Sequence, residues 1–282
     1  MLVLPMAGAA VVLQTHWWLT QVAAVAIWTV GTSMVMGLVT WKVRAATGWG
    51  SVAGAAITAF LMFSTVAFPY TPWHTALVPV LAVAAVAFAC TLLGRGKKER
   101  LGTAEGRRGR SASQVSANLG LAAIVSSSFA QTWFVDSTLF TRASASPMLF
   151  FSLGLATLAE AAADTASSEL GQVFGGRPRM ITTLRSVEPG RDGAISLAGT
   201  LAGIGAAAFV AGAGTLALRG ERAMFVVSFA GGVFGLLFDS LLGATIEERG
   251  WLNNDAVNFL STGSAAAFAL LSLEILPRIG MG

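Results

Sequence analysis

Apolar runs close to the length of a membrane-spanning helix recur along the whole chain, with short polar segments between them. A helix needs about 20 predominantly apolar residues to cross the hydrocarbon core of a bilayer. The pattern predicts about eight spanning helices, over residues 18–40, 51–69, 75–93, 114–135, 147–172, 193–217, 223–247 and 256–277. We therefore expect an all-α polytopic membrane bundle that forms a single domain over residues 1–282.

Composition supports this fold class. The 282 residues are 55% hydrophobic and only 11% charged, whereas a soluble domain has about 25% charged residues. The single cysteine, Cys90, excludes an internal disulfide and a cysteine-based metal site. The first residues lack the basic region of a cleavable signal peptide, so none is expected.

The basic residues are concentrated in "GRGKKERLGTAEGRRGR", which follows the third predicted helix. Basic loops of membrane proteins stay in the cytoplasm. We expect residues 94–113, 173–192 and 248–255 to be cytoplasmic and both termini to be extracytoplasmic, in a prokaryotic plasma membrane. Only the short "RGER" connection opposes this topology. Topology thus explains the net charge of +4, and no nucleic-acid partner is expected.

Acidic residues divide the chain, because no Asp or Glu precedes Glu99. Residues 1–93 are expected to be scaffold, lipid contact or an oligomer surface, such as that of a homodimer. Residues 94–113 form the basic loop, and residues 114–282 hold the catalytic helices.

Five acidic residues fall inside predicted spanning helices, where an unpaired charge costs at least ~2.5 kcal/mol. They are Glu160, Asp164, Glu169, Asp239 and Glu274. Two lines of residues at i, i+4 spacing place several of them on shared helix faces, namely Glu160, Asp164 and Ser168, and Asp239, Gly243 and Glu247. The acids either form ion pairs that lock the helices together or hold a divalent cation, and Mg²⁺ prefers such oxygen ligands. Glu274 stands apart, and we expect it to be structural.

A second polar element follows the fifth predicted helix, in "GGRPRMITTLRSVEPGRDGAISLAGTLAG". Its arginines and threonines lead into a glycine turn and a helix start near Ser196. The N-terminus of a helix presents free N–H groups to an anion. The segment therefore indicates a phosphate site, although positive loop charge and small-residue helix packing would give the same pattern.

Pairs of polar residues begin two further helices. Gln114 and Asn118 are four residues apart, as are Asn254 and Asn258. An asparagine at position 253 or 254 is a candidate helix N-cap. Asn118 and Asn258 lie inside apolar helices and need partners. With the acids and the arginines, these residues converge on the cytoplasmic half of the membrane.

Several blocks, "RSASQVSAN", "ADTASSELG", "PRMITTLRSVEPG", "SLAGTLAG", "DSLLGAT" and "NNDAVNF", resemble the membrane family that includes the plant and cyanobacterial phytyl-phosphate kinase. The resemblance runs from about Ala45 to the C-terminus. It implies phosphorylation of a prenyl monophosphate to the diphosphate by CTP or another nucleoside triphosphate. The matching positions are Asn118, Asp164, Ser168, Glu169, Pro178, Thr182, Thr183, Gly190, Ser196, Gly199, Asp239, Thr245, Asn254, Asp255 and Asn258. Arg191 and Asp192 depart from the small residues that the family has in this turn.

Together, the residues and the resemblance predict phosphate chemistry at the cytoplasmic membrane face. We assign Asp164, Glu169 and Asp239 to Mg²⁺, and Arg179, Arg185 and Thr183 to phosphates. Arg110 is a further phosphate candidate, and Asn118, Asn254 and Asn258 are expected to orient the head group or the nucleotide. The prenyl tail is expected in a groove between helices that is open to lipid. A cytidylyltransferase, a prenyl-alcohol kinase, a transporter and a purely structural membrane protein remain as alternatives, and no P-loop motif is present.

Overall fold

The computed structural model describes residues 2–103, 109–136 and 147–275, and the side chains of residues 135, 136, 274 and 275 are also outside this description. Glu274 and the arginines at positions 107 and 108 therefore lie outside the described side chains. The helices are α1 Val3–Gln21, α2 Ala23–Lys42, α3 Gly48–Ser64, α4 Leu77–Leu92, α5 Arg95–Leu101, α6 Ala112–Val125, α7 Ser128–Asp136, α8 Pro147–Phe174, α9 Leu197–Ala217, α10 Arg222–Leu242 and α11 Asn254–Ile275. A 3₁₀ turn covers Pro72–His74, and a π-helical turn, Gly243–Glu247, extends α10. Two short antiparallel strands, β1 Arg179–Met180 and β2 Ala194–Ile195, pair in the loop after α8.

The all-α membrane fold predicted from the sequence is confirmed. Within the described residues, five helices are long and apolar enough to cross a membrane, namely α2, α8, α9, α10 with its π-helical turn, and α11. The count rises to six if α4 and α5, which meet at 64°, form one bent span. The expected number of about eight spans exceeds this count because α3 and α6 are shorter apolar helices of 17 and 14 residues.

Two predicted boundaries are wrong. Residues 18–21 belong to α1, and one non-helical residue, Val22, separates α1 from α2. The expected helix 114–135 is divided at Ser126 and Ser127, where the hydroxyl of Ser127 accepts a hydrogen bond from the amide of Ala130 at 3.2 Å. Serine side chains at such positions offer the backbone an alternative to continuing the helix.

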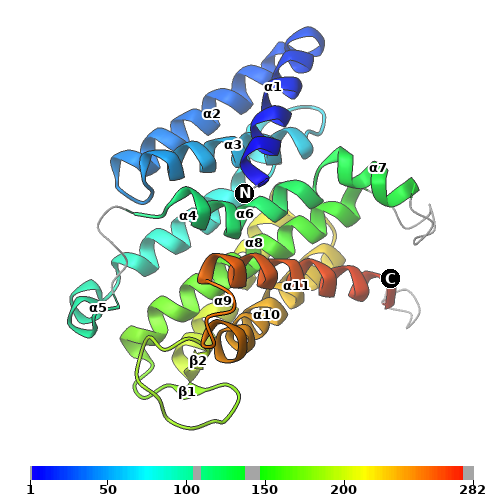
Figure 1. The fold of residues 1–282 in the computed structure, drawn as a ribbon. Helices are drawn as coiled ribbons and strands as arrows, with labels where there is room; N and C mark the ends of the chain where they lie inside the picture. The colour runs from blue at the N-terminus through cyan, green and yellow to red at the C-terminus, as the bar shows by residue number, and fades with distance from the viewer. Residues whose placement is uncertain (1, 104–108, 137–146, 276–282) are drawn as a thin grey trace.

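Helix α8 forms the centre of the bundle and packs against α4, α6, α9, α10 and α11 (Figure 1). Alanines fill most of its middle, and glycines of α10 face them. A Cβ atom at Gly232 would lie 2.8 Å from that of Ala159. Small residues let helices approach closely in a membrane, where lipid removes the hydrophobic drive between them.

The N-terminal helices α1, α2 and α3 form a group at one side of this bundle (Figure 1). Helix α3 packs on α6 and joins the group to the bundle, whereas α2 packs mainly against α1 and α3. The end of α8, the strands β1 and β2, and the start of α9 gather at one end of the bundle. This end holds the polar residues that the sequence singled out.

Candidate functional site

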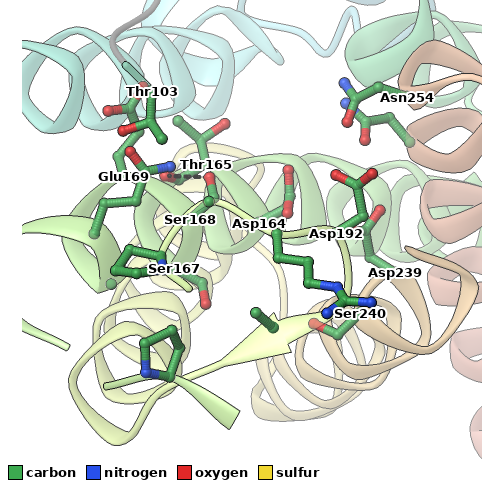
Figure 2. Close-up of a pocket in the computed structure, with 18 of the residues that line it drawn as sticks. Thr103, Asp164, Thr165, Ser167, Ser168, Glu169, Asp192, Asp239, Ser240 and Asn254 are labelled. Carbon is green, nitrogen blue, oxygen red and sulfur yellow. Dashed lines mark hydrogen bonds between the residues drawn. The ribbon is translucent and has the colours of Figure 1, made fainter. Parts of the chain in front are cut away.

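A polar pocket of about 350 Å³ opens at this end of the bundle, between α6, α8, α10, α11 and the loop that leads into α9 (Figure 2). The structure brings ten of the predicted site residues to its wall: Arg110, Asn118, Asp164, Ser168, Glu169, Gly190, Ser196, Asp239, Asn254 and Asn258. These residues are up to 148 positions apart in the sequence, from Arg110 to Asn258. The predicted convergence of polar residues from distant helices therefore matches the structure.

Asp164 of α8 and Asp239 of α10 lie near one another at the pocket, with Asp192 of the intervening loop beside them (Figure 2). One helical turn before Asp164 in α8, Glu160 is only 1% exposed, and neither of its carboxylate oxygens has a hydrogen-bond partner among the described residues. The same holds for Oδ1 of Asp239. Buried ionised carboxylates need a partner, because their desolvation costs several kcal/mol. The orphaned oxygens thus indicate a position where a cation or a proton belongs.

Glycine creates the space for this acidic group. A Cβ atom at Gly235 of α10 would lie 2.5 Å from Cγ of Glu160 and 3.0 Å from the Cβ atom of Ala265 in α11. The π-helical turn after α10 brings Glu247 to the pocket as well. The predicted line from Asp239 through Gly243 to Glu247 therefore points at the site even though the α-helix ends at Leu242.

Glu169, the third predicted metal ligand, lines the pocket but has another partner. Its carboxylate forms an ion pair with Lys98 of α5 and accepts a hydrogen bond from the hydroxyl of Thr91 at 3.4 Å. The helix continues past it, so Glu169 points about 140° away from Asp164 around the axis. Within the described residues, no three His, Cys, Asp or Glu side chains come together as a ready-made metal-binding group.

Arg110 joins the pocket to the N-terminal helices. Its guanidinium donates a hydrogen bond to the hydroxyl of Thr165 at 3.2 Å, so its charge lies on the pocket side. Its carbonyl accepts from the amide of Thr47 at 2.9 Å, and its amide donates to the carbonyl of Ala45 at 3.0 Å. The next residue, Ser111, caps α6 by a reciprocal pair of hydrogen bonds with Gln114.

The buried amides at the other side of the pocket are partners of one another. The side-chain amide of Asn258 donates to the side-chain oxygen of Asn118 at 3.2 Å, and that of Asn118 donates to the carbonyl of Gln114 at 2.9 Å. Asn253 caps α11 by accepting from the amide of Ala256 at 3.0 Å. Asn254 reaches the pocket wall, whereas Asp255 does not. Asn118 and Asn258, which the sequence predicted to need hydrogen-bond partners, therefore find them within the site.

Several predicted phosphate contacts lie away from the pocket wall, namely Arg179, Thr182, Thr183 and Arg185. All four are exposed, and the guanidinium of Arg179 donates to the carbonyl of Leu184 at 3.1 Å. The physical reason is a local turn over residues 180–185, in which the amide of Met180 donates to the carbonyl of Arg185 at 2.9 Å. The later part of this loop, from Pro189 to Asp192, lines the pocket instead. Gly199 is also not in the wall. Its absent side chain lets α9 approach α8, since a Cβ atom there would lie 2.6 Å from the carbonyl oxygen of Ser167.

Other residues of the wall were not assigned a role from the sequence, among them Thr103, Arg191, Asp192 and Ser240. Arg191 forms an ion pair with Glu248, which ties the glycine turn to the residue that follows the π-helical turn. The signal for Arg191 and Asp192 was present in "GRDGA", a charged pair in a turn expected to bind an anion. Ser240 follows Asp239 directly, and Thr103 had no signal of its own.

Fold and site together define a polytopic helical membrane protein with an acid- and arginine-lined pocket at one end of its bundle. The chain belongs to the integral membrane protein family DUF92, whose model matches residues 31–266. No solved structure matches the chain.

Relatives occur in archaea, cyanobacteria and plants. An uncharacterized membrane protein of Methanocaldococcus jannaschii is 45% identical over 108 residues, or 38% of this chain and 45% of that protein. One of Synechocystis sp. is 34% identical over 211 residues, or 70% of this chain and 73% of that protein. The chloroplastic protein VTE6 of Arabidopsis thaliana is 29% identical over 201 residues, or 70% of this chain and 58% of that protein. The chain thus spans about half of the archaeal and plant proteins.

Proposed function

We propose that the protein is a membrane kinase that converts a prenyl monophosphate to the diphosphate, with CTP as the nucleoside triphosphate and Mg²⁺ as the cofactor. The observation that carries the proposal is the pocket itself. Acidic and basic side chains from four separate segments meet there, at one end of an otherwise apolar bundle. A lipid with a phosphate head group matches such surroundings, because its phosphate suits the charged pocket and its hydrocarbon tail suits the apolar bundle. The sequence resemblance to the phytyl-phosphate kinase family and the similarity to VTE6 support the same reaction.

Asp164 and Asp239 are the residues that we assign to Mg²⁺. The unpartnered Oδ1 of Asp239 and the unpartnered carboxylate of Glu160 fit a cation at this point. Mg²⁺ is usually held by one or two carboxylates, waters and substrate phosphates, so a pair of aspartates is a sufficient protein contribution. When bound, it neutralises charge on the transferred phosphoryl group. Glu169 is left out of this ligand set because Lys98 occupies its carboxylate.

Arg110 and Arg191 are the basic residues of the pocket wall, and we assign them to phosphate oxygens. A guanidinium fork pairs with phosphate in a bidentate manner, which fixes orientation as well as charge. Ser196 and the start of α9 supply hydroxyl and backbone donors on the same side. Arg179, Thr182, Thr183 and Arg185 are excluded from the proposed contacts because of their position outside the wall.

The acceptor explains why the pocket contains no histidine in its described wall. The oxygen of a phosphate monoester is already ionised near neutral pH and attacks without a general base. A prenyl-alcohol kinase would have to remove a proton from a neutral hydroxyl. Phosphoryl transfer otherwise rests on positioning and charge neutralisation, which the arginines and aspartates can supply.

A substrate panel tests the proposal. Purified protein in lipid nanodiscs is incubated with prenyl alcohols, prenyl monophosphates and γ-labelled nucleoside triphosphates. We expect label to enter a prenyl diphosphate only with a monophosphate acceptor and Mg²⁺, and fastest with CTP. Asp164→Asn is the matched inactive control. Transfer to alcohols alone would favour the prenyl-alcohol kinase, and no transfer to any acceptor would refute a kinase.

A further inference from the structure

An apolar groove of about 760 Å³ runs between α2 and α3, outside the polar pocket. Its volume lies within the range of small-molecule pockets, roughly 300–1,000 Å³. Met34 and Leu38 of α2 form one side, and Val52 and Ala56 of α3 form the other. The small side chains of α3 leave the space open. No step of the chemistry described above uses this groove.

The groove begins at the same end of the bundle as the polar pocket. Trp41 and Trp49, which line its mouth, are both exposed, and such residues mark the membrane interface. Lys42 and Arg44 are exposed beside the mouth, so an anionic head group is favoured there. From Gly48 to Ala59 the lining follows α3 for about 16 Å at 1.5 Å per residue. That length is about half of the ~30 Å hydrocarbon core.

Only a thin partition separates the mouth of the groove from the polar pocket. It consists of residues 44–47 and 109–111, joined by the backbone hydrogen bonds of Arg110 to Ala45 and Thr47 at 3.0 and 2.9 Å. Thr47 lines the groove on one side, and the guanidinium of Arg110 reaches Thr165 in the pocket on the other. Gly109 has a positive φ of 75° and packs against the carbonyl of Arg44, where a Cβ atom would not fit.

We propose that this groove holds the hydrocarbon tail of the prenyl monophosphate, with the phosphate passing over the partition to Arg110. This inference rests on the proposed kinase function. The apolar lining fits the tail, and Lys42, Arg44 and Arg110 complement the phosphate charge. Lipid is as apolar as the groove, so burial of the tail adds little affinity. The groove instead directs the tail so that the phosphate lies at the acids, and orientation is what lowers the barrier.

A matched pair of variants tests the groove. Val52 lines it and is 57% exposed, whereas Val35 does not line it and is 61% exposed on α2. Val52→Trp fills the groove, and Val35→Trp adds the same bulk to the lipid-facing surface. We expect Val52→Trp to lower kcat/KM for a 20-carbon prenyl monophosphate about tenfold and to leave that for a five-carbon acceptor unchanged. Val35→Trp should change neither value.

Photocrosslinking gives a readout that does not need turnover. A prenyl monophosphate with a diazirine at the tail end should label α2 and α3 between residues 30 and 59 in the wild type, and this labelling should fall in Val52→Trp. Equal labelling by a diazirine phosphatidylcholine at the same molar ratio would identify a site for bilayer lipid and overturn the inference. Labelling confined to other helices would overturn it as well. Turnover of the five-carbon acceptor tests the kinase function separately, so the two failures are distinguishable.

Discussion

Lys98 is the residue whose removal gives the sharpest test of the site's construction. It is 1% exposed, and its ammonium donates to the carbonyls of Cys90 and Thr91, both at 2.9 Å, and to Glu169. It therefore binds the last carbonyls of α4, where a cation also opposes the negative end of the helix dipole. Gly94 makes the bend between α4 and α5, with φ of 64° and the side chain of Val173 against it. The ion pair between Lys98 and Glu169 thus holds α5 against the C-terminal part of α8.

We expect Lys98→Met and Glu169→Met each to destabilise the protein by about 3–5 kcal/mol, because each leaves a buried charge without its partner. The double variant should lose less than the sum, with a coupling energy of about 2 kcal/mol. Unfolding of the four proteins in detergent measures this cycle. Arg95 and Glu99, on the same helix, form an ion pair in which the two side chains are 37% and 48% exposed. Arg95→Met should therefore cost only about 0–1 kcal/mol.

Kinase turnover of the same proteins decides the role of Glu169. If Glu169 only anchors α5, the double variant Lys98→Met/Glu169→Met should keep most of the wild-type kcat. Each single variant leaves one buried charge without a partner, whereas the double variant leaves none. A metal ligand cannot be replaced by methionine without loss of activity. An inactive but folded double variant would show that Glu169 binds the metal, and additive stabilities would show that the ion pair is not what holds α5.

Three further predictions concern the pocket and its side of the membrane. Asp164→Asn and Asp239→Asn should each lower kcat on the order of a hundredfold or more with unchanged unfolding midpoints, and near wild-type turnover at saturating Mg²⁺ would remove that residue from the ligand set. Arg110→Lys should lower kcat/KM roughly ten- to a hundredfold, since a charge-assisted hydrogen bond contributes about 1.5–3 kcal/mol. Arg185→Lys and Arg222→Lys, both outside the pocket, should be silent, and three equal effects would contradict the assignment. In a Cys90→Ala background, Glu188→Cys should be labelled only after permeabilisation and Trp73→Cys in intact cells; the reverse labelling would invert the topology.

Much of the site could be predicted because burial of polar groups leaves few alternatives. Asn118 and Asn258 needed partners inside apolar helices, and each other's side chain is the partner that the fold supplies. Asp164 and Asp239 had to face a polar space, since neither helix offers a basic residue within reach along its own face. This expectation rests on the free-energy cost of a charged side chain in the membrane, so it does not require knowledge of how the helices are arranged.

The partner of Glu169 could not be found in this way. Lys98 is 71 positions away in the sequence and lies in the short helix α5, within a loop whose positive charge membrane topology alone already explains. Arg179 and Arg185 were assigned by their proximity in sequence to the glycine turn. Both residues instead border a turn that is closed by a hydrogen bond from the amide of Met180 to the carbonyl of Arg185, and their side chains are exposed. Long-range ion pairs and the direction of a loop depend on tertiary packing, which the local pattern of residue types in the sequence does not encode.

The most direct measurement is the fate of the phosphates of CTP with a prenyl monophosphate acceptor. Wild-type protein is supplied with α-labelled or γ-labelled CTP and Mg²⁺, with Asp239→Asn as the control, and the lipid and aqueous products are separated. The account predicts γ label in the terminal phosphate of a prenyl diphosphate, α label remaining in CDP, and neither product in the control. Label from the α position in the lipid, with release of pyrophosphate, would identify a cytidylyltransferase and contradict the proposed kinase.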